Sequence, residues 1–136
     1  MRWDTVVPAW VEVIAADTDV RDVLGTERAF YMAGEREFEV DSLEYQLIVP
    51  AVLYREVFWR TLVQLDFWVR TMADLVKLEK ALLRLLHSDL AVTIGGIAMW
   101  SQHVGDGRAL EGAADNTFTR SLDFQLTYLR NRYDPT

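Results

Sequence analysis

The segment from residue 60 to residue 89 most constrains the fold, because its hydrophobic period changes once, at Thr71. Before that point apolar and polar residues alternate, which is the period of a β-strand with one buried face. After it, leucines recur on one helical face, and Thr71-Met72-Ala73-Asp74 resembles a capping box with Asp in place of Glu. The segment therefore predicts a strand over Leu62–Arg70 that runs directly into one long helix.

The alternation within this strand predicts which side chains share a face. One face is apolar and is expected to be buried, while the other is more polar. The apolar face carries Val63, Leu65, Phe67 and Val69, and the polar face carries Gln64, Asp66 and Arg70 with Trp68 among them.

Two other stretches have helix patterns. Residues 5–16 read as an amphipathic helix with Thr5 as its cap and Pro8 in its first turn. A second short helix is expected over residues 20–24, capped by Asp17 or Thr18 and ended by Gly25.

Four further stretches read as strands, and the clearest alternation lies in the last of them. A tight connection near Trp59-Arg60 is expected to join the second of these to Leu62–Arg70 as a hairpin. Residues 34–46 are expected to form a long loop or extended arm, and 105–116 a mobile loop beginning with Gly105-Asp106-Gly107. These four further stretches are 29–32, 51–58, 97–104 and 118–129.

These elements predict one α+β domain over residues 1–136. Its sheet is expected to be mostly antiparallel with about four strands. One long helix and a short N-terminal helical segment should pack on one face of that sheet.

The composition narrows the function classes. A formal net charge of −7 opposes a basic surface that grips nucleic acid, but it leaves open a negatively charged surface past which DNA slides without adhering. The chain has no cysteine, which excludes disulfides, zinc–thiolate sites and cysteine nucleophiles. No apolar run approaches the about 20 residues that span a bilayer, so neither membrane insertion nor signal-peptide secretion is expected.

The titratable residues do not form a recognisable site. His87 falls at the end of the predicted long helix and His103 near a strand end, and no second histidine lies at metal-ligand spacing from either. The carboxylates Asp17, Asp19 and Asp22 lack the glycine and glutamate of a calcium-binding loop. The glycine-containing turns match no phosphate-binding motif. We therefore predict no catalytic, cofactor-binding or metal-binding residue and no enzymatic activity.

The remaining features concern contact. Trp59 and Trp68 suit either the core or a subunit interface, where tryptophan is enriched. The 34–46 segment suits either a solvated loop or an arm that orders on a neighbour, and we favour the arm. The predicted interface with another subunit or partner comprises Phe38, Val40, Asp41, Trp59, Gln64, Asp66, Trp68 and Arg70.

The order of these patterns resembles the tail terminator, or tail completion, proteins of long-tailed bacteriophages and phage-like particles. An N-terminal helix precedes DTDVRDVLG and AFYM, and a proline then opens VPAVLYREV. RTLVQLDFWVRT feeds into ADLVKLEKALLRLLH, and a GDG turn precedes the final strand FTRSLDFQLTYL. The resemblance covers nearly the whole chain and consists of strand and helix patterns. The 34–46 segment is longer than the family pattern at that place, so no role carries over to it.

The resemblance implies a structural virion protein of the tail neck, assembled in the host cytoplasm. Such proteins form a hexameric ring on the head-proximal end of the tail tube, stop its polymerisation and join it to the head connector. The implied partners are other copies of the chain, the tail tube protein, a connector or neck protein, and genomic DNA passing through the lumen. The resemblance implies no cofactor and no membrane partner.

Two alternatives stay open. A different neck protein, such as a head-closure or head–tail joining subunit, shares the size and the oligomeric habit. A small ligand-binding or enzymatic α+β domain belongs to another class and would show a concave pocket with convergent polar groups. A ring with a wide central hole would exclude that class as the main role.

Overall fold

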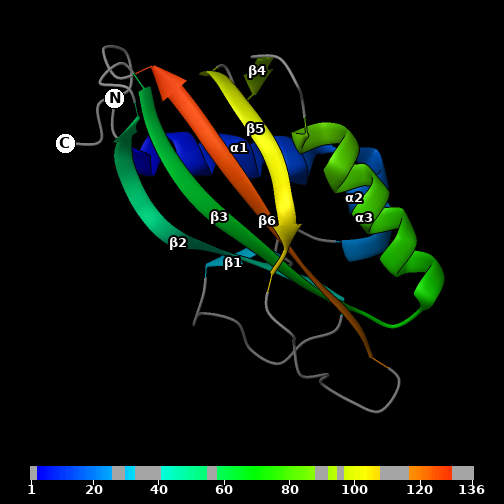
Figure 1. The fold of residues 1–136 in the computed structure, drawn as a ribbon. Helices are drawn as coiled ribbons and strands as arrows, with labels where there is room; N and C mark the ends of the chain where they lie inside the picture. Colours follow the sequence, from blue (N-terminus) through cyan, green and yellow to red (C-terminus); the bar gives the residue numbers. More distant parts are fainter. Residues whose placement is uncertain are drawn as a thin grey trace.

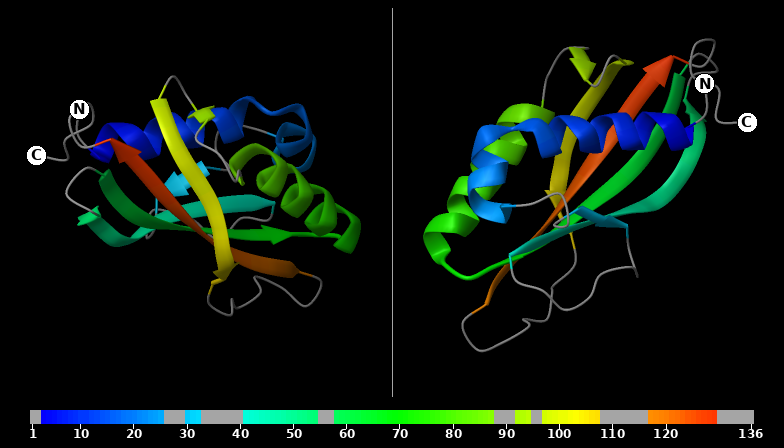
Figure 2. Two further views of the ribbon diagram at one scale, coloured as in Figure 1. Left: turned by 45° about the horizontal axis from the view of Figure 1, so that its top comes forward. Right: turned by 180° about the vertical axis from the view of Figure 1, so that it is seen from behind.

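The computed structural model describes residues 3–25, 30–32, 41–54, 58–87, 92–94, 97–107 and 117–129. They form an α+β fold in two layers, with a twisted sheet and three helices that lie on one of its faces (Figures 1 and 2). The α+β class and the largely antiparallel sheet are as the sequence predicts.

The sheet has six strands in the described part of the chain, in the order β1-β2-β3-β6-β5-β4. Only β1 and β2 pair in parallel; every other neighbouring pair is antiparallel. The four long strands match the predicted number, and two three-residue strands extend the edges. The bounds are β1 Phe30–Met32, β2 Ser42–Tyr54, β3 Phe58–Val69, β4 Val92–Ile94, β5 Ile97–Asp106 and β6 Phe118–Leu129.

The helices are α1 (Trp3–Ala16), α2 (Thr18–Leu24) and α3 (Met72–Leu86). Thr71 caps α3 as predicted, because its hydroxyl accepts a hydrogen bond from the Asp74 N–H at 3.1 Å. Asp17 caps α2, and Gly25 ends it with a φ of 81°.

The N-terminal helix is longer than its sequence pattern indicates. With 14 residues, α1 is nearly as long as α3, which has 15. It starts two residues before the predicted Thr5 cap, so Pro8 lies in its second turn.

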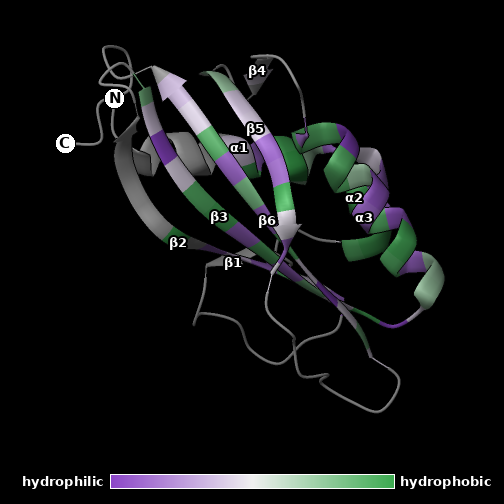
Figure 3. Ribbon diagram, viewed as in Figure 1, coloured by the Kyte–Doolittle hydropathy of each residue, from purple (hydrophilic) through white to green (hydrophobic). Residues whose placement is uncertain are grey.

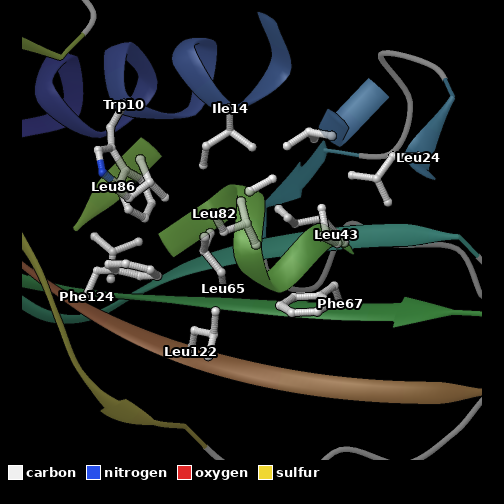
Figure 4. Packing of buried hydrophobic residues seen from close by; sticks show 14 of the residues in the cluster. Trp10, Ile14, Leu24, Leu43, Leu65, Phe67, Leu82, Leu86, Leu122 and Phe124 are labelled. Atoms are coloured by element: carbon white, nitrogen blue, oxygen red, sulfur yellow. The ribbon is translucent and has the colours of Figure 1, made fainter. Parts of the chain in front are cut away.

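The hydrophobic core lies between the helices and the sheet face that they cover, here called the covered face (Figure 4). Trp10 of α1 is fully buried; its ring meets Phe124 of β6 edge-on at 5.5 Å, and its Nε1 donates to Ser101 Oγ at 3.1 Å. Leucines of α3 pack beside it against Leu65 and Phe67 of β3. Burying each such side chain contributes roughly 1.5–3 kcal/mol, which fixes the helices on this face.

Two predicted loops begin inside strands. The expected arm over 34–46 is wrong for residues 42–46, which belong to β2 and pair with β3 from Ser42↔Trp68 to Gln46↔Gln64. Leu43 is buried on the covered face. Charged residues on either side of it, among them Asp41 and Glu44, obscure the alternation of a strand in the sequence. The expected mobile loop over 105–116 is likewise wrong for residues 105–106, which end β5. Residues 33–40 and 108–116 lie outside the described residues.

The connection between β2 and β3 also differs from the prediction. β3 begins at Phe58, so Trp59 and Arg60 lie inside the strand and the connection falls at residues 55–57. β3 pairs with β6 without a register shift from Phe58↔Leu129 to Val69↔Phe118. Because this pairing is unbroken, the side chains that alternate along β3 and β6 stay on the same two faces of the sheet over the full length of both strands (Figure 3).

Candidate interaction surfaces

The sheet face turned away from the helices, here called the outer face, carries a hydrogen-bonded polar ladder across three strands. Gln46 of β2 donates from Nε2 to Gln64 Oε1 of β3 at 2.9 Å. Gln64 Nε2 donates to Ser121 Oγ of β6 at 2.6 Å, and Ser121 Oγ donates to Asp66 Oδ1 at 2.6 Å. Asp66 is fully buried and Gln64 is 5% exposed. The ladder thus satisfies polar groups that the fold removes from water.

Gly107, just after β5, closes over this ladder. Its N–H donates to the Ser121 carbonyl at 2.8 Å. A Cβ at this position would overlap Ser121 Oγ and stand 2.5 Å from Gln64 Nε2 and 2.8 Å from Asp123 Oδ1. Only glycine lets the backbone approach the ladder this closely.

Asp123 is an outer-face carboxylate whose hydrogen bonding is incomplete. It faces Gln64 across the β3–β6 ladder, and its buried Oδ1 accepts no hydrogen bond from the described residues. Burial raises the pKa of its carboxyl, and the nearby negative charges of Asp66 and Asp106 raise it further, against a lowering by His103.

Three residues predicted for the interface are buried in the single chain. Gln64, Asp66 and Trp68 are at most 6% exposed, so little of their surface is accessible, and their contact with a neighbouring subunit or the tail tube stays a prediction. The alternation of β3 was read correctly, and the polar groups of its buried outer face are satisfied by Gln46 of β2 and Ser121 of β6.

The other predicted interface residues occupy different places. Asp41 and Arg70 meet at one end of the β2–β3 pair, where Asp41 Oδ1 accepts the Arg70 N–H at 3.0 Å and Arg70 is exposed. Trp59 is half-buried at the margin of the core on the covered face. Phe38 and Val40 lie outside the described residues.

The exposed large hydrophobic residues were missed by the sequence reasoning. In the described part of the chain they are Ile48, Met72, Val76 and Val104, exposed by 42%, 52%, 41% and 53%. Met72 opens the leucine-rich helix, and Val76 follows one turn later. The helical period carries a signal for Val76, which falls outside the Leu75–Leu78–Leu82 stripe that the core uses, whereas Met72 has stripe spacing to Leu75 and is exposed in the first turn.

Ion pairs join two of the helices. Arg84 of α3 donates to Asp17 Oδ1 at 2.9 Å, and Lys77 Nζ lies 3.2 Å from Asp22 Oδ2. Burial raises the pKa of the Asp17 carboxyl, but the hydrogen bonds from Arg84 and the Val20 N–H prevail and the pKa is lowered. The cap of α2 is therefore also a charged link to α3.

Both histidines of the chain meet between α3 and β5. The backbone N–H of His103 in β5 donates to His87 Nδ1 at 3.0 Å, so this N–H is bonded to a side chain and not to a neighbouring strand. The His103 ring packs on Phe124 at 5.6 Å, and its Nε2 lies 3.9 Å from Asp106 Oδ1. The sequence separation of 16 residues gave no indication of this contact.

Both long edges of the sheet are also irregular. β2 has register shifts between Leu47 and Val49 and between Val49 and Val52, around Pro50, and β5 has one between His103 and Gly105. Such bulges and prolines hinder another strand from adding to an edge. We therefore expect contacts with other proteins to use side chains rather than strand addition.

Within the described residues, no group of three or more His, Cys, Asp or Glu side chains is arranged to hold a metal ion. The helices of the described part are too short or too polar to cross a membrane.

Comparison with known proteins adds information on the fold only. No protein-family model matches the chain, and no curated protein matches it. Nine solved chains are similar, among them a protein whose name states no function, with a TM-score of 0.54 and 15% sequence identity over 93% of this chain and 96% of that one. At this identity the match shows a shared fold over nearly the full length of both chains and does not bear on activity or partners.

Proposed function

We propose that the protein is a structural subunit of a ring at the head-proximal end of a phage tail tube. In this role it ends tube polymerisation and joins the tail to the head connector. The ring is hexameric, and its partners are neighbouring copies, the tube protein and a connector protein. The role is one of assembly and requires no catalysis.

The order of the elements carries the proposal. The stretches that carry the resemblance to tail terminators fall on α1, α2, β1, β2, the β3–α3 unit and β6, in that order. The strand-to-helix junction at Thr71 and the uninterrupted β6 strand support the proposal, because both belong to the stretches on which the resemblance is based. The arrangement of the elements therefore supports the proposed role without a catalytic signature.

The layer arrangement is suited to this role. All three described helices pack on one face, so the subunit presents a helical side and an outer sheet side that differ in chemistry (Figures 1 and 2). A head-to-tail contact joins two different sides of neighbouring subunits. Repeating this contact gives a closed ring when the rotations between successive subunits add up to a full turn. The net charge of −7 also suits a lumen through which DNA passes, since like charges repel.

The proposal is tested by measuring the mass of the purified protein by light scattering and by imaging it in negative stain. Rings of about six subunits with a hole wide enough for duplex DNA are the expected result. If the protein is monomeric alone, purified tail tubes are added, and rings should appear on one end of each tube. Failure to form rings in both conditions would overturn the proposal, and rings found on a head connector instead would indicate another neck protein.

A further inference from the structure

Two exposed patches on different elements are complementary in character. The first, the α3 patch, consists of Met72, Val76 and Lys80, which follow one another at four-residue spacing along the solvent side of α3. The second, the β5 patch, consists of Val104 and Asp106 at the end of β5. Each combines an exposed aliphatic surface with one charge, and the two charges have opposite sign.

The charge of the α3 patch is available for a partner. Lys77 and Arg84 on the same helix are engaged with carboxylates of α2, but Lys80 is exposed and makes no ion pair within the described part of the chain. The β5 patch is similar, because the Asp106 side chain is 66% exposed and its contact with His103 is long, at 3.9 Å. Opposite charges placed in this way favour one orientation of encounter and disfavour a contact between like patches.

The two patches lie on different layers of the same subunit. α3 belongs to the helical layer, whereas β5 is a strand of the sheet, next to its β4 edge (Figures 1 and 2). Self-association through them therefore joins unlike surfaces head to tail, the contact that generates rings.

We propose that the α3 patch of one copy of this chain docks on the β5 patch of the next copy, with Val76 against Val104 and Lys80 against Asp106. The inference rests on the ring proposed above and names its contact. Three of the four exposed large hydrophobic residues in the described part are covered by this contact. The fourth, Ile48 of β2, lies outside it and supplies a matched control.

The absence of cysteine from the chain allows a direct test by disulfide trapping. A disulfide requires Cβ atoms within about 4.5 Å, so it forms only where the two positions meet. The double variant Val76→Cys with Val104→Cys, oxidised at high protein concentration, should form a ladder of linked chains that ends at one closed size. The control Val76→Cys with Ile48→Cys should give no such ladder.

Charge reversal gives a second readout on the same contact. Lys80→Asp and Asp106→Lys should each weaken self-association by about tenfold or more, measured by sedimentation, and the double reversal should restore it to near the original value. Both positions are exposed, so the folding of the variants, followed by circular dichroism, should be unchanged.

The outcomes separate this inference from the proposed function. If rings form but the Val76/Val104 pair links no better than the Ile48 control, the contact is wrong and the ring proposal stands. If the double charge reversal fails to rescue the single variants, the pairing of Lys80 with Asp106 is wrong. If no rings form with or without tail tubes, the proposed function fails, whatever the cross-linking shows.

Discussion

The two faces of β3 are both buried, but by different means. On the covered face Leu65 and Phe67 are enclosed by apolar side chains of the helices, and they are fully buried. On the outer face Gln64 and Asp66 are as deeply enclosed, but each is held by hydrogen bonds to another strand. Burial within one strand therefore does not imply apolarity.

The difference assigns the two faces different roles in folding. Apolar packing is non-directional and supplies most of the favourable free energy. A buried polar ladder contributes less net stability, but it disfavours every register in which a carboxylate or amide loses its partner. The uninterrupted pairing of β3 with β6 is consistent with a register held by the outer face and a stability supplied by the covered face.

Truncating the covered face should have the largest effect. Phe67→Ala leaves a cavity among residues that are fully buried, and we expect it to lower the free energy of unfolding by about 3–5 kcal/mol. Denaturant unfolding measures the loss. The control Ile48→Ala removes an exposed side chain and should change stability by less than about 0.5 kcal/mol. Equal losses would mean that the covered face is not the main source of stability.

Breaking the polar ladder should cost less. Ser121→Ala removes the hydroxyl that joins Gln64 to Asp66, and we expect a loss of about 1–3 kcal/mol in the free energy of unfolding. Gly107→Ala should cause a loss of similar size, because its new Cβ would overlap Ser121 Oγ.

The double variant sharpens this comparison. Since Ser121→Ala removes the atom with which Cβ at position 107 overlaps most, the combined loss should be smaller than the sum of the two single losses. Strict additivity would show that Gly107 does not act through the ladder.

Sequence reasoning succeeded where the signal was local. The β3–α3 unit follows from a change of period and a cap within a few residues of Thr71, and β6 follows from its own alternation. It failed where a partner distant in sequence decides the outcome. Asp66 can be buried because Ser121 of the neighbouring strand donates a hydrogen bond to its carboxylate. Ser121 lies 55 residues away in the sequence, and the period of β3 carries no information on that contact.

The helical layer and the outer face should also respond to acid in opposite directions. The pKa of Asp17 is lowered in the folded state, so its stabilising contribution is present above its unfolded pKa and is lost as the pH falls through the folded pKa. Asp17→Asn keeps a capping oxygen but loses the charge that Arg84 contacts. It should destabilise the protein by about 0.5 kcal/mol at pH 7, and the difference should vanish in strong acid. Unfolding curves of both proteins over that pH range measure it.

Asp123 should show the reverse sign and the smallest effect. Burial raises the pKa of its carboxyl in the folded state, so the fold is favoured below the unfolded pKa and loses stability as the pH rises through the folded pKa. Asp123→Asn removes this cost, and we expect a gain of a few tenths of a kcal/mol at pH 7 that disappears below pH ~4, because solvent screens a partly exposed group. A loss of stability at pH 7 would mean that the ionised carboxylate is needed by the outer face. In that case the polar ladder would depend on charge as well as on hydrogen bonding. The two faces of β3 would then differ in electrostatics as well as in the hydrogen bonds that join Gln64, Ser121 and Asp66.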